Sequence, residues 1–503
     1  MIKKNYDSDF CGSLPLHQIN LIQPYGYLFV ANKSDLRIIQ ASENVNDLLG
    51  EPVDQVVGKS LEQFIRQEEA DLLKGRFGSG IDEKVPLTIN LTRSDAARRY
   101  IALVHVKSDY VVLEVEEAGD ESTFLDVFQE LKYVMAEINR AETVAAASKV
   151  VVEQLKKLSG FDKILMYQFD EQWNGTVIAE VKEDGMEEYL GHKFPASDIP
   201  KQARKLYLKN SYRLIPSREY TPVKLYPVIN PVSNTFIDLS DCNLRAVAAV
   251  HLEYMKNMKI RASMSVRVIR DDKLWGLISC HHKEPMYLNY EMCSVFELLS
   301  SVISNKISSL ESGEEYQFVN SLQEKKTQII ENVYSEKDLV AGMLKQDLKI
   351  TDLFSAEGAA VSYRGSIETT GEVPDNEELK NLIYWLQSKP EDKVYHTSNL
   401  SSEYDFGSAF SKQASGMISI PVNADRGEYI MMFRPEVVTT VKWGGNPDEA
   451  INFDSNGVKY HPRSSFGSWQ EVVKQTAKAW KEEEVEVAEN LRSFIFEYSA
   501  KTL

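Results

Sequence analysis

The sequence predicts an α+β protein made of three α+β domains joined by long helices, and three observations support this. The chain has 503 residues, which is too long for a single hydrophobic core. Its 43% hydrophobic and 10% aromatic content is typical of globular proteins and not of disordered chains. Strand-like and helix-like runs also alternate within three separate blocks. We therefore expect domains at residues 1–120, 121–310 and 311–503.

The first block has the pattern of a small α+β unit. Apolar, β-rich runs separated by polar turns predict strands, and two short periodic runs predict helices. The expected strands are 25–32, 36–42, 85–91 and 110–116, and the expected helices are 44–50 and 60–67. A polar stretch at 116–123 marks the boundary with the next block.

The second and third blocks repeat this mixture of helices and strands. The second block predicts helices at 124–140 and 143–160, and strands at 163–169, 175–181, 262–270 and 274–282. The third block predicts strands at 359–365, 416–422 and 428–435, and a helix at 480–503. Between them, apolar residues recur every three or four positions from 290 to 333. Such a long helix is expected to bridge domains or to pair with a copy of itself.

Charge and motifs exclude several classes of function. The net charge of −18, from 57 basic and 75 acidic residues, argues against a broad nucleic-acid-binding face. The sequence has no apolar run long enough for a membrane span and no signal peptide at its start. The four cysteines lack paired spacing and read as reduced thiols of a cytoplasmic protein. Walker, dinucleotide-binding, kinase and cyclase motifs are also missing.

A few residues are candidates for chemistry, although each has an ordinary structural explanation. His251 and Tyr254 share a helix face, and a histidine there is commonly a satisfied core residue. Cys280, His281 and His282 are adjacent on a strand, so they face alternate sides and do not predict a shared metal ion. An arginine such as that in HPRSSF, residues 461–466, is usually a surface cation.

Four motifs in one order change this assessment. They are Cys11 followed by PLHQINLIQPYG, then FPASDIP at 194–200, then His251 and Tyr254 followed by CHH, and finally PRSSF at 462–466. Together they resemble the photosensory core of phytochromes, and specifically of bacteriophytochromes. The resemblance covers nearly the whole chain in the order PAS, GAF, PHY. It implies a figure-of-eight knot between PAS and GAF, and a PHY hairpin, the tongue, at about 434–472.

The resemblance implies a covalently bound linear tetrapyrrole. Cys11 matches the thiol that forms a thioether with ring A. Relatives that carry the thiol in the GAF domain have it just before the position of His251, where this chain has Val250. This departure favours biliverdin IXα as the cofactor. Ile22 matches the residue that passes through the GAF lasso of the knot.

The resemblance also implies roles for the pocket residues. Arginine suits the two propionates because its planar fork pairs with carboxylates. The propionate set is Tyr207, Arg213, Arg245, Ser263 and Ser265. The aromatic wall around ring D is Tyr167, Phe194 and Tyr254, and its carbonyl bonds His281. The Asp198 carbonyl and His251 face the ring nitrogens, and Ile199, before Pro200, fixes that backbone direction.

Signalling residues follow from the same resemblance. The carboxylate of Asp198 is expected to leave the pocket and pair with Arg463 on the tongue. Residues two apart face the same side of a strand but not of a helix, so a strand-to-helix change would replace Arg463 by Ser465. Trp443 and Trp469 would exchange places in the new packing. We expect a homodimer through the long helices and a C-terminal output module, a histidine kinase or diguanylate cyclase, with a response regulator as a further partner.

Three functions remain open at this stage. The first is a red/far-red photoswitch that binds biliverdin, which we expect to be a non-enzyme because light-driven isomerisation of a bound pigment is not enzyme turnover. The second is a bilin sensor, or sensor of haem degradation, that does not photoconvert. The third is a GAF regulator of another class, such as a cyclic-nucleotide sensor. Cys11 separates the first two from the third, and the hairpin with Arg463 separates the first from the second.

Overall fold

The computed structural model describes residues 16–77, 84–91, 99–119, 121–389, 393–449, 451–453 and 460–502. The chain forms two compact units. The first comprises Met1–Leu310 and Lys442–Trp469, and the second comprises Glu311–Val441 and Gln470–Leu503. A segment far along the sequence therefore belongs to the same unit as the first two blocks.

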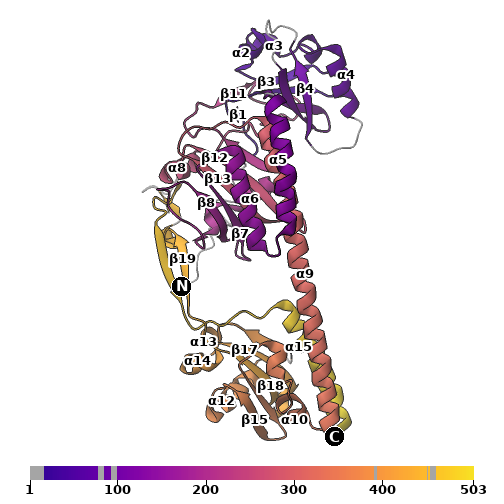
Figure 1. Cartoon of the computed structure of the whole chain (residues 1–503), viewed down its shortest axis with the longest axis vertical. Helices are drawn as coiled ribbons and strands as arrows, with labels where there is room; N and C mark the ends of the chain where they lie inside the picture. Colours follow the sequence, from indigo (N-terminus) through magenta and orange to yellow (C-terminus); the bar gives the residue numbers. More distant parts are fainter. Residues whose placement is uncertain are drawn as a thin grey trace. The chain divides into compact units, whose positions relative to one another are not determined.

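The N-terminal part of the first unit is a seven-stranded sheet in the order β1-β11-β3-β2-β6-β5-β4 (Figure 1). Its strands are β1 Leu21–Ile22, β2 Tyr27–Asn32, β3 Ile38–Ser42, β4 Val85–Asn90, β5 Arg99–Val106, β6 Tyr110–Glu117 and β11 Val223–Tyr226. All four expected strands are confirmed, whereas β5 was not predicted. The second block contributes β11, so this sheet is not built from the first block alone.

Short helices cover this sheet, and one of them differs from the prediction. The helices are α2 Val45–Leu49, α3 Val53–Val56 and α4 Gln67–Arg76. The helix expected at 60–67 is wrong, because only a 3-10 turn, η2 Leu61–Gln63, forms there. The true helix starts at Gln67, where the Glu69 carboxylate accepts a hydrogen bond from the Arg66 backbone N–H at 3.1 Å.

The second sheet of the first unit has eight strands in the order β10-β12-β13-β7-β8-β9-β19-β22. Its strands are β7 Lys163–Phe169, β8 Gly175–Lys182, β9 Lys193–Phe194, β10 Tyr212–Ile215, β12 Ala262–Arg270, β13 Lys273–His282, β19 Thr439–Gly444 and β22 Ser468–Val473. The four strands predicted for this block are confirmed as β7, β8, β12 and β13. Trp443 of β19 pairs with Lys193 of β9, which extends the sheet with a strand from the third block.

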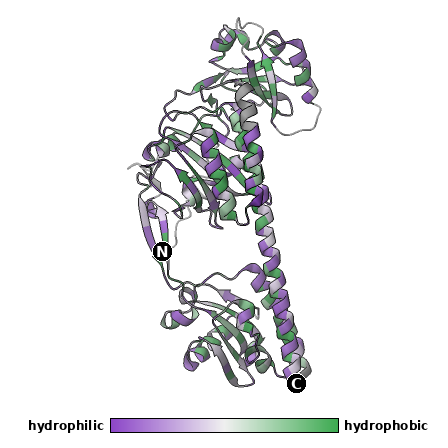
Figure 2. Ribbon diagram, in the orientation of Figure 1, coloured by the Kyte–Doolittle hydropathy of each residue, from purple (hydrophilic) through white to green (hydrophobic). Residues whose placement is uncertain are grey.

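Two helices pack on one side of this sheet. They are α5 Glu121–Arg140 and α6 Val144–Ser159, which run side by side in Figure 1. The Thr143 side chain caps α6 by accepting a hydrogen bond from the Ala146 N–H at 3.1 Å. Val151 and Leu155 are four residues apart and therefore share the buried face of α6. Hydrophobic and hydrophilic residues are intermixed along the described parts of these helices in Figure 2, as expected for helices with one buried face.

The other side of the sheet carries shorter elements and the hairpin. These are the 3-10 turn η3 Ala196–Asp198, α7 Lys201–Lys209, α8 Ala249–Asn257, the 3-10 turn η6 Pro447–Glu449 and the paired strands β20 Ile451–Phe453 and β21 Tyr460–Pro462. They leave room for a cavity against the sheet.

The predicted long helix is confirmed as α9, Tyr290–Glu336, with 47 residues. Phe296 and Ile303 on its first half are buried in the core of the first unit. Ile329 and Val333 on its second half are buried in the core of the second unit. One continuous helix therefore supplies core residues to both units, which explains its unusual length.

The second unit is built on an antiparallel sheet in the order β15-β14-β18-β17-β16. Its elements are α10 Leu339–Leu344, α11 Ile350–Phe354, β14 Gly358–Tyr363, β15 Ser366–Gly371, α12 Asn376–Gln387, β16 Tyr395–Thr397, α13 Leu400–Glu403, η4 Gly407–Phe410, α14 Ser411–Ala414, β17 Gly416–Asn423, η5 Ala424–Arg426, β18 Glu428–Arg434 and α15 Glu482–Thr502. Ile430 and Met432 enter one core, while Met431 and Phe433 enter another. This alternation gives the sheet two buried faces.

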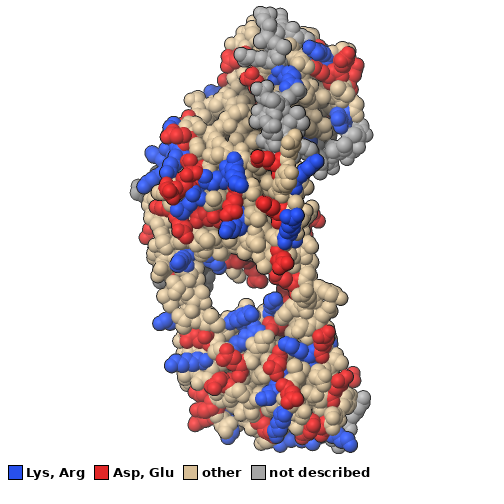
Figure 3. All heavy atoms as spheres, viewed as in Figure 1, with Lys and Arg blue, Asp and Glu red and all other residues tan. Residues whose placement is uncertain are grey.

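The surface carries charges of both signs, as expected from 57 basic and 75 acidic residues. Acidic and basic residues are interspersed on the face drawn in Figure 3. Among the helices of the described residues, none is both long and apolar enough to cross a membrane.

Candidate functional site

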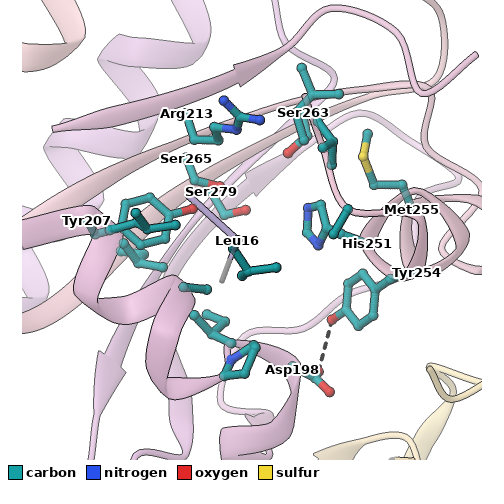
Figure 4. Close-up of a pocket in the computed structure, with 18 of the residues that line it drawn as sticks. Leu16, Asp198, Tyr207, Arg213, His251, Tyr254, Met255, Ser263, Ser265 and Ser279 are labelled. Atoms are coloured by element: carbon teal, nitrogen blue, oxygen red, sulfur yellow. Dashed lines mark hydrogen bonds between the residues drawn. The ribbon is translucent and has the colours of Figure 1, made fainter. Parts of the chain in front are cut away.

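A cavity of about 400 Å³ lies in the first unit between the eight-stranded sheet and the helices α7 and α8. This volume is within the range of roughly 300–1,000 Å³ for small-molecule sites. The predicted residues that line it are Tyr167, Phe194, Asp198, Ile199, Tyr207, Arg213, Arg245, His251, Tyr254, Ser263, Ser265 and His281. Figure 4 labels several of them, including Asp198, Arg213 and His251, together with Leu16. Cys11 lies outside the described residues, and Leu16 is the cavity residue nearest to it in sequence.

The cationic side of the cavity is formed by Arg213 and Arg245. Arg213 donates to the carbonyl of Asn243 at 2.7 Å and also to that of Arg245. Arg245 donates to the carbonyl of Leu16 at 3.0 Å, while its Nε has no hydrogen-bond partner among the described residues. Burial, and the nearby Arg213 charge, lower the pKa of Arg245 to about 9. Among the described residues, no carboxylate forms an ion pair with either guanidinium group, so both could bind an anionic ligand.

Two neutral histidines line the cavity, His281 from the sheet strand β13 and His251 from the helix α8. His281 Nε2 lies 3.1 Å from the hydroxyl of Ser279, a residue that the sequence did not single out. Burial lowers the pKa of His281 to about 3, with smaller contributions from Lys163 and His251. Burial and Arg213 lower the pKa of His251 to about 4. Both imidazoles are thus uncharged at neutral pH and can each offer one donor and one acceptor.

Aromatic rings form another part of the cavity lining, called the aromatic wall here. Tyr167 and Phe194 meet edge to face, with centroids 5.5 Å apart. The rings of His251 and Tyr254 stack at 5.9 Å, as their spacing on a helix predicted. Tyr189 packs edge-on against Phe194 at 5.3 Å, although it does not line the cavity and was not predicted. Its only signal in the sequence was its place in a loop just before FPASDIP.

Asp198 links the cavity to the hairpin. Its carboxylate accepts a hydrogen bond from the Tyr254 hydroxyl at 2.9 Å, the dashed line in Figure 4, and forms an ion pair with Arg463. The side chains of Arg463 and Asp198 are only 2% and 6% exposed, so Arg463 is not a surface cation. Burial raises the pKa of Asp198, and Arg463 opposes that shift. The carboxylate therefore lies at the edge of the cavity beside Tyr254 and does not point to solvent.

The hairpin packs against the same wall. The Arg463 guanidinium lies 5.2 Å from the Phe194 ring and 4.6 Å from the ring of Phe466, which sequence reasoning missed. A Cβ at Gly444 would lie 2.6 Å from the Phe194 ring, which explains the glycine after Trp443. Asn257 of α8 also donates to the Arg463 carbonyl at 3.1 Å.

The remaining signalling residues are placed less centrally. Trp443 is buried on β19 beside β9. Ser465 is exposed and Trp469 is half-buried on β22. Ile22 is fully buried, pairs with Val223 and bridges to Arg245.

Among the described residues, one further group of side chains belongs to residue types that can bind metal ions. His105, Glu114 and Cys242 are buried, with their ligand atoms within 4.8 Å of one another. His105 Nε2 is hydrogen-bonded to Glu114 Oε1 at 2.7 Å, and the other Glu114 oxygen accepts the Leu244 N–H at 2.6 Å. These bonds fasten the segment before Arg245 to the seven-stranded sheet without requiring an ion.

Comparisons with known proteins agree with this geometry. Family models match in the order PAS fold at residues 11–118, GAF domain at 144–307 and phytochrome region at 322–502. Cyanobacterial phytochrome B of Nostoc is 35% identical over 97% of this chain and 66% of its own length. The bacteriophytochrome of Xanthomonas campestris is 31% identical over 97% of this chain and 78% of its own length.

Solved structures give the same result. A bacteriophytochrome of R. palustris matches with a TM-score of 0.84 and 31% identity over 98% of this chain and 99% of that one. The Stigmatella aurantiaca phytochrome photosensory core module matches with a TM-score of 0.83 and 34% identity, again over 98% and 99%. The chain spans 66%, 64% and 65% of the length of three curated phytochromes. The chain therefore belongs to the phytochrome family of light photoreceptors and contains its PAS–GAF–PHY photosensory core.

Proposed function

We propose that this chain is a red/far-red photoswitch that binds biliverdin IXα covalently through Cys11. The observation that carries the proposal is a cavity lined by two half-buried arginines and several aromatic rings, with a hairpin arginine paired to Asp198 at its edge. The bound bilin would supply light absorption and isomerisation at ring D. Val250 lines the cavity beside His251 and offers no competing thiol, which favours Cys11 as the attachment site.

Each side of the cavity supports a distinct part of this function. Arg213 and Arg245, with Tyr207, Ser263 and Ser265, would bind the two propionates. The neutral imidazole of His251 and the backbone carbonyl of Asp198 would accept or share protons of the pyrrole nitrogens. His281 would donate to the ring D carbonyl. Tyr167, Phe194 and Tyr254 shape a space without anchoring its occupant, which leaves room for a rotating ring.

The hairpin would carry the signal out of the cavity. In the dark-type state Arg463 is paired with Asp198. In the light-activated state Ser465 would replace it as the hairpin changes from strand to helix, with Trp443 and Trp469 exchanging places. The change would pass through α9 and α15 to an output module such as a histidine kinase or diguanylate cyclase. The proposed domains are residues 1–120, 121–310 and 311–503, with the tongue at about 434–472. Ile22 would pass through the proposed knot, and the proposed location of the protein is the cytoplasm.

The decisive experiment is to mix the protein with biliverdin and record absorption before and after red light. We expect a red-absorbing complex that converts to a far-red-absorbing form. After denaturation, the wild type should retain pigment on a gel and Cys11→Ser should not. A coloured complex that ignores light would favour the bilin sensor, and no complex at all would favour another class of GAF regulator. Pigment that stays on Cys11→Ser would refute the attachment site.

We also propose a homodimer through the long helices. Aromatic side chains are exposed on three of them: Tyr133 on α5 at 76%, Tyr316 on α9 at 69% and Phe496 on α15 at 70%. Exposed aromatic side chains on long helices can pack against a second helix when two chains associate. Light scattering at tens of micromolar should give twice the chain mass, and Tyr316→Glu with Phe496→Glu should weaken association. A monomer at that concentration would contradict this proposal.

A further inference from the structure

A buried ion pair lies in the first unit outside the cavity. Lys163, the first residue of β7, places its Nζ 2.8 Å from Oε1 of Glu180 on β8. The two side chains are 2% and 3% exposed. Neither residue lines the cavity, and the proposed function assigns a role to neither. A buried ion pair is seldom a strong stabiliser compared with apolar packing, so its presence calls for another explanation.

The ion pair holds the loop that precedes FPASDIP. The second Glu180 oxygen accepts hydrogen bonds from the backbone N–H groups of Tyr189 and Leu190, both at 2.8 Å. Lys163 Nζ donates to the Glu187 carbonyl at 2.7 Å and lies 3.6 Å from the centre of the Tyr189 ring. The Tyr189 hydroxyl donates to the Glu187 carboxylate at 2.7 Å. The backbone and the ring of Tyr189 are therefore both fixed by the two charged side chains.

Tyr189 in turn supports the residue shared by the cavity and the hairpin. Its ring meets Phe194 edge to face at 5.3 Å and 89°. Phe194 contacts Tyr167 on the cavity side and the Arg463 guanidinium on the hairpin side. A Cβ on Gly444 would lie 2.6 Å from the Phe194 ring, so the hairpin backbone packs closely against this ring. A displacement of Tyr189 would therefore be transmitted to both the aromatic wall and the docked hairpin.

We propose that Lys163 and Glu180 are positioning residues that set the aromatic wall and hairpin docking through Tyr189 and Phe194. The photochemical part of this inference rests on the proposed function, whereas the structural part does not. Lys163 also lies opposite His281 in the register of β7 and β13. Its charge adds to the burial that lowers the pKa of His281, so it helps to keep this imidazole neutral.

The first test uses the protein without bilin and measures amide hydrogen exchange. In Lys163→Met, the Tyr189 and Leu190 amides and the hairpin strands β19 and β22 should exchange roughly two- to thirtyfold faster, the range for residues that couple two sites. Lys163→Arg should restore slow exchange. Lys156→Met removes a cation from the more exposed Lys156–Glu183 pair of the same unit and should change neither segment. Unchanged exchange in folded Lys163→Met would overturn the proposal.

The second test measures light response after assembly with biliverdin. Lys163→Met and Lys163→Met/Glu180→Gln should bind pigment, yet photoconvert less completely and revert in darkness at a rate altered by about two- to thirtyfold. Thermal unfolding monitored by circular dichroism identifies a variant that merely fails to fold. In the double variant, Glu180→Gln removes the carboxylate charge that Lys163→Met alone would leave buried without its cation. Wild-type photochemistry in both folded variants would overturn the positioning role. A wild type that does not photoconvert would refute the proposed function instead, and the exchange experiment would still decide the structural part.

Discussion

Arg245→Met is expected to stabilise the bilin-free protein while weakening its binding of bilin. Arg245 is a half-buried cation beside a second cation, Arg213, and its buried Nε has no partner among the described residues. Replacing a half-buried charge that has no carboxylate partner among the described residues by an apolar side chain should raise the free energy of unfolding, at most by the roughly 1–4 kcal/mol gained when buried ion pairs are replaced by apolar residues. Denaturant unfolding of the apoprotein measures this directly. Arg261→Met, which removes an arginine paired with Glu219 and Glu284 near the surface, should not be stabilising.

The pH dependence of this gain has a definite sign. Since the folded state lowers the pKa of Arg245 to about 9, it holds this proton less tightly than the unfolded chain does. The cost of the charge is therefore fully present below that pKa and is lost as the pH rises through it. The stability difference between Arg245→Met and the wild type should shrink at alkaline pH. A difference that grows there would show that Arg245 has another stabilising partner.

The effect of Arg245→Met on bilin binding can be tested with two ligands that differ only in the charge of their propionates. Losing one partner of a buried charge pair costs about 2–5 kcal/mol of binding free energy. Arg245→Met should lose this amount with biliverdin but much less with its dimethyl ester, in which the propionates carry no charge. The wild type should prefer biliverdin over the ester by a similar margin. Equal binding of both ligands by the wild type would remove Arg245 from the propionate site.

The sequence predicts most secondary structure here because the patterns are local. The strand at 163–169 and the helix from 290 carry their periodicity in consecutive residues, and both form nearly as expected. The helix expected at 60–67 failed because Ser60 and Glu69 side chains bond nearby backbone N–H groups and move the helix start to Gln67. The strand β11 joins a sheet from another block, and no local pattern encodes such pairing.

For the cavity too, sequence motifs identified some residues, whereas residues that matter through tertiary contacts were not identified. Motif resemblance assigned residues such as His251 and Asp198, and the fold brings them to one cavity. It did not assign Tyr189, Phe466 or the Lys163–Glu180 pair, because their importance depends on which rings they contact. The environment of a charged residue also cannot be read from its neighbours in the sequence. Arg463 has the sequence context of a surface cation, yet its side chain is enclosed between Phe194 and Phe466.

Arg463→Ala is expected to weaken hairpin docking more than any other single change in the hairpin. It would leave the Asp198 carboxylate buried with the Tyr254 hydroxyl as its remaining side-chain partner. Breaking a buried pair by removing one partner costs about 3–5 kcal/mol. Hydrogen exchange of β19 and β22 should rise accordingly. Ser465→Ala is the matched control, because Ser465 is exposed in this arrangement and its loss should leave exchange unchanged.

The pH dependence of Arg463→Ala distinguishes an electrostatic effect from lost packing. Burial already raises the pKa of Asp198, and without Arg463 that pKa must rise further. The docked state then binds the Asp198 proton more tightly than the undocked state, so docking weakens as the pH rises through the new pKa and recovers as the pH falls. The double variant Asp198→Asn/Arg463→Ala has no carboxylate at position 198, so its docking should no longer depend on pH in this way. If Arg463→Ala docks equally well at all pH values, the Asp198–Arg463 pair does not hold the hairpin, and the proposed route from the cavity to the output module fails with it.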